Sequence, residues 1–483
     1  MTTASLAAVA VSGVAAPMRT PPIFGECRAL LRLATPLMLI ALVNMGMSVT
    51  DTLMVSAAFG ADALAAVAVG SDFYSILFYF GAGTIGGLAP FYTAAVAKSD
   101  PAERARLERT GRMLVLVIAA ALVPFVWTAP NWLGRFGLDH DLLAEGRGYT
   151  RAMALTMIPM LAVMLYRTIL TAAERPKVFL KVTGAMLPLN ALGNLVFMHG
   201  LGPIPALGPT GAGVSSLLVA LVSLAILVLV ARRAAPASAV APHQPTIRWR
   251  DLEPVLRVGL PIGVAMVTEL GIFLVATLYA ATLGAADVAA HTLTLRVAGI
   301  AYAVPAALLQ AAMVRMARAE TLGDPVARRS VTLGSLGLSM GAGTALLVGL
   351  ALVATPLAYG VFDDTPAGLA AAGMAAGLLL LLGLMEVIVN PGAAAAGLLR
   401  GRRDTRAPML FTLAGYWVVG APLGLWLCEI RELGITGIWI GLAAGAATTT
   451  LFTLARLFST RCRPPTGVAA LAGSVHPTKP RRE

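Results

Sequence analysis

The stretch ATPLMLIALVNMGMSVTDTLMVSAAFGADALAAVAVG (residues 34–70) is repeated later in the chain by VGLPIGVAMVTELGIFLVATLYAATLGAADVAAHTLTL (residues 258–295). The register holds to within one residue, so that Gly60 matches Gly284. Both stretches are long and apolar, as a pair of membrane-crossing segments would be. The chain therefore contains an internal duplication whose unit covers about half of its length.

A second pair of related stretches follows the first at a similar offset. LTAAERPKVFLKV (170–182) corresponds to LLRGRRDTRAPMLFTL (398–413). Two homologous halves built of apolar segments are typical of secondary transporters, in which one half rocks against the other around a central substrate path. The duplication thus predicts a two-lobed transporter.

The composition indicates a membrane protein. The chain is 58% hydrophobic and 12% charged, with a mean hydropathy of +0.81, whereas about 25% charged residues is usual in soluble proteins. A transmembrane helix needs about 20 apolar residues. A barrel is excluded because its strands would alternate apolar and polar residues. We predict an all-α integral membrane protein with twelve transmembrane helices in two homologous six-helix bundles, near 34–56, 64–92, 113–130, 152–172, 179–199, 211–231, 258–281, 288–313, 331–354, 369–397, 409–428 and 435–458.

The orientation follows from Lys and Arg, which favour cytoplasmic loops. Most of the 36 basic residues fall on one side if the N-terminus is placed in the cytoplasm, and both termini are then cytoplasmic. The net charge of +12 is spread among short loops, so a nucleic-acid partner is not expected. The predicted units are an N-terminal arm (1–33), an N-lobe (34–231), a linker (232–257), a C-lobe (258–458) and a basic tail (459–483).

Motifs of other function classes are missing from the sequence. The three cysteines are scattered and have no metal-site spacing, and the sequence lacks a phosphate-binding loop and a nucleophile elbow. The first seventeen residues lack the basic region of a signal peptide, and Met18 is an alternative start. We expect neither an enzyme nor an ATP-driven pump.

Polar residues inside the predicted helices are the candidates for function, because a charge in the bilayer costs at least ~2.5–3.5 kcal/mol. Asp51 has no basic residue nearby in sequence and is either a proton or Na⁺ site or an interfacial acid reached by water. Asn190 and Asn194 share one helical face and either coordinate a cation or join helices. Ser215 and Ser216 are weaker candidates for hydroxyl ligands.

The second half contributes a different set. Glu269 lies near the middle of its helix and is a candidate proton carrier and substrate-binding acid, and its repeat counterpart is Asn44. Arg296 lies at a similar depth in the next helix and must find a partner there, for which Glu269 is the obvious candidate. Arg296 is then either half of a structural ion pair or a ligand for an acidic substrate.

Three further residues have alternative interpretations. Glu386 stands five residues before Pro391, which would break the helix and present carbonyls to a cavity. It is a coupling acid or only an acid lining a crevice. His291 is expected to be structural or interfacial. Glu174 is expected to set turn geometry and topology in its loop.

The ordered set of these segments resembles one family. DTLMVSAAFGADALAAVAVG, NALGNLVFMHGLGPIPALGPTGAGVSS, LGAADVAAHTLTLRVAGIAYAVPAALLQAA and GLLRGRRDTRAPMLFTLAGYWVVGAPLG are similar to stretches of the multidrug and toxic compound extrusion (MATE) transporters. The likeness runs from about Leu31 to Phe458. It implies two six-helix bundles, a V-shaped central cavity, and antiport of organic molecules against Na⁺ or H⁺.

The resemblance also assigns site residues in the N-lobe. Asp51 matches the acid in the first helix of bacterial and archaeal members, and Asn190 matches the Asn beside it. Asn194 stands where members have Asp or Asn, and Ser216 where Thr is usual. These residues resemble the cation site of the N-lobe, with Na⁺ at Asp51, Asn190 and Asn194 as one alternative.

In the C-lobe the match is less regular. Glu269 corresponds to the acid in the seventh helix of bacterial Na⁺-coupled members. The acid of their tenth helix falls on Val389, and Glu386 replaces it only if residues 390–392 are an insertion. Arg296 replaces a usual Asn.

The expected function is secondary active export of small organic molecules from the cytoplasm, driven by H⁺ or Na⁺, in a bacterial inner membrane. The cation-coupling candidates are Asp51, Asn190, Asn194, Ser216, Glu269 and Glu386, and the substrate-binding candidates are Glu269, Arg296 and Asn44. We expect no cofactor, and a monomer whose partners are its substrate and the lipid bilayer. The alternative is a lipid-linked oligosaccharide flippase of the same superfamily.

Overall fold

The computed structural model describes residues 23–137, 139–234 and 249–459, and in these ranges the chain folds almost entirely into helices without a β-strand. Most of the predicted arm, linker and tail, at 1–22, 235–248 and 460–483, lies outside them. The elements are α1 (Ile23–Gly86), α2 (Ala89–Ala97), α3 (Pro101–Trp132), the 3₁₀ turn η1 (Leu133–Phe136), α4 (His140–Glu145), α5 (Arg147–Ala172), α6 (Pro176–His199), α7 (Thr210–Ala234), α8 (Trp249–Leu283), α9 (Ala285–Ala301), α10 (Ala303–Leu322), α11 (Pro325–Val361), α12 (Pro366–Gly401), α13 (Arg406–Leu413), the π-helix η3 (Ala414–Gly420), α14 (Ala421–Glu429) and α15 (Gly434–Ser459).

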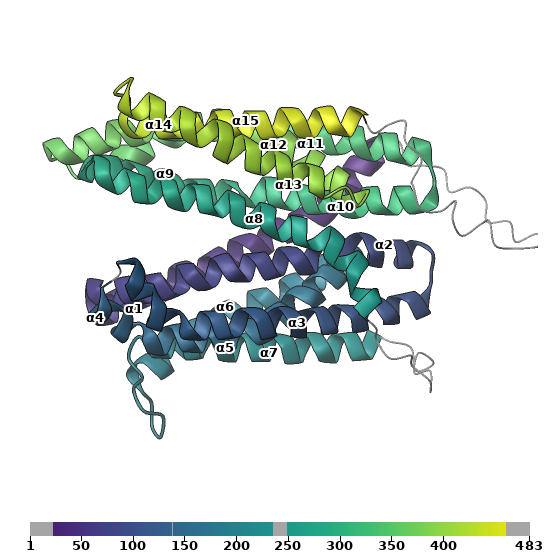
Figure 1. Ribbon diagram of the computed structural model, residues 1–483, viewed down its shortest axis with the longest axis horizontal. Helices are drawn as coiled ribbons and strands as arrows, with labels where there is room; N and C mark the ends of the chain where they lie inside the picture. Colours follow the sequence, from purple (N-terminus) through teal and green to yellow (C-terminus); the bar gives the residue numbers. More distant parts are fainter. Residues whose placement is uncertain (1–22, 138, 235–248, 460–483) are drawn as a thin grey trace, which may run out of the picture.

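The described part of the chain has eleven helices that are long and apolar enough to cross a membrane, not twelve. The difference arises at the first, Ile23–Ala97, which covers both predicted segments 34–56 and 64–92. Its 75 residues would extend about 110 Å as one straight helix, well beyond the roughly 30 Å of a bilayer core. Gly60 interrupts it with φ 82° and ψ −170°. In Figure 1 the beginning of α1 and α2 lie at the same end of the molecule, because the chain turns back at this glycine.

The predicted duplication has a counterpart in the backbone. Gly60 and Gly284, which the sequence aligns, both have positive φ, at 82° and 149°. Glu174 and Arg403, from the second pair of related stretches, also share the left-handed conformation, at 58° and 65°. Non-glycine residues rarely adopt positive φ. The two halves therefore use the same local backbone geometry at corresponding loops.

The starts of two corresponding helices are also built alike. Asp100 precedes Pro101 at the start of α3, and its side chain accepts a hydrogen bond from the Glu103 amide at 2.9 Å. Asp324 precedes Pro325 at the start of α11 and caps the helix in the same way. Proline at the first helical position and Asp at the N-cap are strong start signals. The helix ends thus repeat with the sequence.

Figure 1 shows the helices in two groups. One contains α3, α5, α6 and α7, the other contains α9, α11, α12, α14 and α15, and α1 and α8 cross between them. The crossing places Gly83 of α1 and Gly87, directly after its end, against Gly263 and Gly259 of α8, where an added Cβ would overlap the facing backbone. Small residues spaced by four allow such close approach of membrane helices. This glycine crossing joins the two halves.

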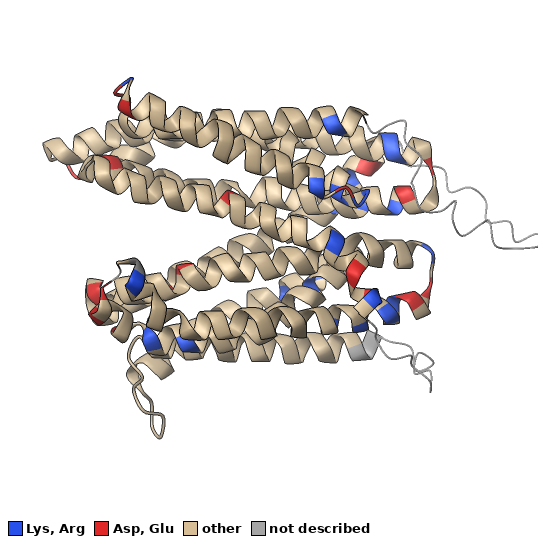
Figure 2. Ribbon diagram, in the orientation of Figure 1, with Lys and Arg blue, Asp and Glu red and all other residues tan. Residues whose placement is uncertain are grey.

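Lys and Arg gather at one end of the molecule, at the right in Figure 2. We call it the basic end and define it by the loops that join α2 to α3, α5 to α6, α10 to α11 and α12 to α13. Two boundary predictions near this end were wrong. The predicted linker reached residue 257, but α8 already begins at Trp249. The predicted segment 369–397 ended before Arg400, but α12 continues to Gly401 and includes it.

Candidate functional site

The N-terminal half brings together an acid and two amides, as predicted. The Asn194 Nδ2 atom donates a hydrogen bond to the Asp51 Oδ1 atom at 2.6 Å, from α6 to the first segment of α1. Asn190 lies one turn earlier in α6, near the same carboxyl but without a hydrogen bond to it. Both asparagines are essentially inaccessible, at 1% and 0% exposure, and Asp51 is half-buried. We call these three residues the Asp51 site.

The Asp51 site contains amide oxygens without donors. The Oδ1 atoms of Asn190 and Asn194 are buried and accept no hydrogen bond from the described residues, and the Asn190 Nδ2 atom is also unpaired. A buried polar atom without a partner costs about 1–3 kcal/mol. Carboxylate and amide oxygens are the donor set that hard cations prefer. The residues present therefore suit a Na⁺ ion or a proton.

Serine contributes differently from the prediction. The Ser215 Oγ atom of α7 donates to the Asn190 carbonyl at 3.1 Å. Ser215 can approach α6 this closely because residue 193 is a glycine, where an added Cβ would overlap the Ser215 hydroxyl. Ser216 is half-buried and has no hydrogen bond among the described residues. Ser215 thus holds α6 and α7 together behind the Asp51 site, whereas the role predicted for Ser216 stays a prediction.

In the C-terminal half, Glu269 does not pair with Arg296. The Glu269 Oε2 atom lies 3.5 Å from the Tyr302 hydroxyl, and the carboxyl interacts electrostatically with Arg400. Arg296 is exposed and interacts electrostatically with Asp72 of α1. The predicted Glu269–Arg296 pair is therefore wrong in this conformation, in which the two residues have different electrostatic partners.

Glu386 is held by its own helix. The Asn390 Nδ2 atom donates to the Glu386 carboxylate and to its carbonyl, each at 2.8 Å, and both residues are buried. The Asn390 Oδ1 atom accepts nothing within the described residues. The helix α12 continues through Pro391, as the predicted segment 369–397 does. Tyr416 of η3 interacts with both Glu386 and Glu269, which places these two acids in one cluster.

His291 has a structural role, as expected. It is fully buried, and the Trp439 indole donates to its Nδ1 atom at 3.1 Å. The Nε2 atom must then carry the proton and donate to the Thr277 hydroxyl at 2.9 Å. Both ring nitrogens are used, so His291 joins α9 to α15 and α8. Asn44, the counterpart of Glu269, is exposed and makes no hydrogen bond among the described residues.

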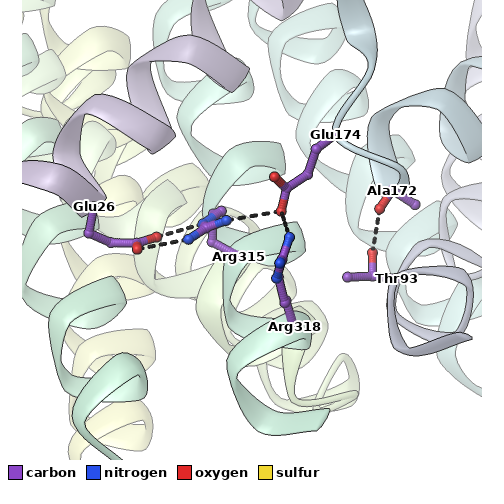
Figure 3. Close-up of polar contacts among 6 residues, drawn as sticks. All are labelled: Glu26, Thr93, Ala172, Glu174, Arg315 and Arg318. Atoms are coloured by element: carbon purple, nitrogen blue, oxygen red, sulfur yellow. Dashed lines mark hydrogen bonds and ion pairs between the residues drawn. The ribbon is translucent and has the colours of Figure 1, made fainter. Parts of the chain in front are cut away.

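An ion-pair network at the basic end connects the two halves (Figure 3). Arg315 of α10 forms a bidentate pair with Glu26 of α1, at 2.6 and 2.8 Å. Its remaining nitrogen binds Glu174, from the loop between α5 and α6, at 3.0 Å, and Arg318 binds the same carboxylate at 3.2 Å. Glu26 is 2% exposed. Sequence reasoning gave Glu174 only a local role, and Glu26 was not singled out.

Two further contacts join the halves at this end. Arg106 of α3 binds Asp251 of α8 at 2.9 Å. The Arg403 guanidinium stacks over the Phe91 ring of α2, 4.1 Å from its centroid. Contacts between the halves therefore hold them together at the basic end.

The chain is similar to known transporters over most of its length. The family model described as MatE matches residues 36–196 and 261–426, one match in each half. A probable multidrug resistance protein NorM of Mesorhizobium japonicum is 32% identical over 460 residues, covering 91% of this chain and 95% of the relative. One of Deinococcus radiodurans is 33% identical over 447 residues, covering 90% and 96%.

Solved structures show the same fold. The crystal structure of the eukaryotic MATE transporter AtDTX14 matches with a TM-score of 0.80 at 17% identity, covering 91% of this chain and 96% of that one. A multidrug resistance MATE family transporter in an outward-facing conformation matches equally well, with a TM-score of 0.80 at 18% identity and 90% and 96% coverage. The predicted helical membrane architecture is confirmed.

Proposed function

Because the chain belongs to the MatE family of multi-pass membrane transporters, we propose that it is a cation-coupled antiporter that exports small organic molecules. Multidrug efflux is the activity that the names of its relatives indicate. Those names favour an exporter over a lipid-linked oligosaccharide flippase. Export occurs from the cytoplasm across a bacterial inner membrane, with the basic end in the cytoplasm because Lys and Arg favour that side.

The observation that carries the proposal is the set of unpaired buried oxygens around Asp51. The Asn190 and Asn194 oxygens have no donor in the described part of the chain, and a bound cation would supply a partner for them. A Na⁺ ion could be coordinated by both amide oxygens, whereas a proton on Asp51 would supply a donor for one of them. A cation that binds from the outside and is released to the inside moves down its electrochemical gradient, and this movement drives export of the substrate.

Transport requires the two halves to open at alternate ends. The network of Glu26, Glu174 and Arg315 closes the basic end in this conformation, and the glycine crossing of α1 and α8 provides a close contact about which the halves can move. Cation binding at the Asp51 site is linked to this equilibrium if it favours one of the two conformations. The coupling free energy is then set by the difference in cation affinity between the two conformations.

The experiment is dye transport in inverted membrane vesicles, with Na⁺ and pH gradients imposed separately. We expect one gradient to drive accumulation of ethidium and the other to have little effect. Vesicles from cells lacking the protein are the control. Accumulation that is the same with and without both gradients would refute a cation-coupled antiporter.

A further inference from the structure

A cavity of about 500 Å³ lies at the basic end, where the two halves meet. Phe91 of α2, from the first half, forms one part of its lining, and the first turns of α8 and the loop between α12 and α13 contribute to the rest. None of the lining residues belongs to the Asp51 site. We call this space the basic-end cavity. Its volume is within the roughly 300–1,000 Å³ that is usual for small-molecule sites.

The lining of the basic-end cavity is both charged and apolar. Its charged residues are Glu253, Arg257, Arg403, Asp404 and Arg406, and its apolar residues are Phe91, Pro254 and Val258. The Glu253 carboxylate pairs with Arg257 at 2.8 Å. The Asp404 carboxylate pairs with Arg456 at 3.0 Å. Each acid of the lining is therefore already engaged by an arginine.

Two arginines of the lining are left. Arg403 and Arg406 have no acid at ion-pair distance among the described residues. The Arg403 guanidinium is held at the cavity by its stack over the Phe91 ring, 4.1 Å from the centroid. Arg406 is exposed. Both guanidinium groups thus have donors available for a further anion.

Acids beyond this lining do not neutralise the two arginines. A smaller cavity of about 250 Å³ shares Phe91 and Arg403 with the first, and Glu103 of α3 lines it. Glu103 accepts two hydrogen bonds from Arg106, both at 2.7 Å, and it interacts with Arg403 only electrostatically. The charged residues that the first half contributes here, with their bonded partners, are balanced in sign: Lys98, Arg104 and Arg106 against Asp100, Glu103 and Asp251. The positive charges of Arg403 and Arg406 are therefore not offset.

The start of α13 adds hydrogen-bond donors to the basic-end cavity. Thr405, which lines the cavity, is the N-cap residue of α13 and is 3% exposed, and its side chain caps none of the first amides of the helix. These amides have no partner within a helix, and the helix dipole makes this end positive. Anions bind at such ends. The guanidinium groups and the helix amides thus favour the same class of ligand.

We propose that the basic-end cavity binds a phosphate group, carried by an anionic phospholipid or by a soluble phosphate monoester. Arg403 and Arg406 hold the phosphate through charge-assisted hydrogen bonds, which guanidinium groups form in bidentate geometry. Phe91, Pro254 and Val258 offer an apolar surface to the remainder of the ligand. Basic pockets between membrane helices on the cytoplasmic side bind anionic headgroups, and the basic end is cytoplasmic in the proposed orientation. Binding at this site is additional to export and needs no gradient.

The test measures binding of phosphatidylglycerol to the purified protein in detergent by native mass spectrometry, with phosphatidylcholine as the reference lipid. The wild type should bind phosphatidylglycerol more tightly than phosphatidylcholine. Arg403→Gln and Arg406→Gln should each weaken phosphatidylglycerol binding about fivefold, because each removes one basic group from the anionic headgroup. Arg403→Lys and Arg406→Lys keep the charge but lose the guanidinium fork, so they should weaken binding as well.

Two further variants separate a built site from a general attraction of the basic end for anionic lipid. Arg329→Gln is the matched control, since Arg329 is an exposed arginine in the first turns of α11 that does not line the cavity. It should change phosphatidylglycerol binding less than twofold. Glu253→Gln removes the acid that holds Arg257, so a third guanidinium becomes available, and phosphatidylglycerol should bind about fivefold more tightly.

Glycerol 3-phosphate, titrated by calorimetry, distinguishes the two sources of phosphate. Phosphatidylglycerol binding that Arg406→Gln weakens, without glycerol 3-phosphate binding, identifies a lipid headgroup as the ligand. Glycerol 3-phosphate binding that Arg406→Gln weakens identifies a soluble phosphate monoester. If Arg403→Gln does not fold, Arg406→Gln decides alone.

Three results would overturn the proposal. They are an equal loss of binding in Arg329→Gln, unchanged affinity in the folded variants of Arg403 and Arg406, and binding of neither probe by the wild type. Gradient-driven ethidium export by the same preparation shows whether the proposed function stands independently, because lipid and phosphate binding are measured without a gradient.

Discussion

Neutralising Glu26 should open the basic end. Glu26 and Arg315 form two hydrogen bonds, at 2.6 and 2.8 Å, and their side chains are only 3% and 15% exposed. Breaking a buried ion pair costs about 3–5 kcal/mol. Glu174 still binds Arg315, so we take the lower end, about 3 kcal/mol. The pair joins the two halves, so Glu26→Gln should penalise the conformation closed at this end and shift the equilibrium about a hundredfold.

The chain has its own probe for this change. Cys27 packs against Gly334 of α11, in the other half. Maleimide labelling of Cys27, followed by peptide mass spectrometry, should be faster in Glu26→Gln than in the wild type, while labelling of the buried Cys428 stays slow. Glu253→Gln is the matched control, because it breaks only an exposed pair within α8. Equal Cys27 labelling in wild type, Glu26→Gln and Glu253→Gln would refute a closing role for the network.

Three other predictions test the framework around the sites. His291→Ala should lower the unfolding free energy by about 3 kcal/mol, because it leaves the fully buried Trp439 indole unpaired, and a thermal melt unchanged from the wild type would contradict this. Gly259→Ala should slow transport and destabilise the protein by about 1–3 kcal/mol through overlap with the Thr84 carbonyl, whereas Gly271→Ala, with room beside Trp417, should have little effect in the same assays. In spheroplasts of a cysteine-free background, an impermeant maleimide should label Arg431→Cys and spare Arg257→Cys; the reverse pattern would invert the topology.

The fold could be predicted from sequence because its signals are repetitive. The length of the apolar segments predicted the helices. The register of the duplication aligned Gly60 with Gly284, and both have positive φ. The helix count differed by one because Gly60 interrupts α1 without separating it into two elements. The predicted segments 34–56 and 64–92 nevertheless placed the boundary around Gly60, where the chain turns back.

Within the sites, residues that share a face of one helix could be predicted from their spacing in the sequence. Contacts between side chains of different helices could not. The shared face of Asn190 and Asn194 indicated a polar site, and the family resemblance grouped it with Asp51, to which Asn194 donates a hydrogen bond. The predicted segment 369–397 ended before Arg400, although Arg400 lies in the last turn of α12 and interacts electrostatically with Glu269. The pairing of Glu26 with Arg315 joins residues 289 positions apart, and no local pattern marks such a contact.

The central claim is that the exchanged cation binds at Asp51 beside Asn190 and Asn194. The most direct test is gradient-driven ethidium efflux in proteoliposomes containing wild type, Asp51→Asn or Asp62→Asn, with circular dichroism to confirm folding. Asp62 is the matched control because it lies on α1 beyond Gly60 and is exposed. The account predicts that Asp51→Asn binds ethidium but loses efflux driven by either gradient, while Asp62→Asn matches the wild type. Full gradient-driven efflux by a folded Asp51→Asn protein would contradict it.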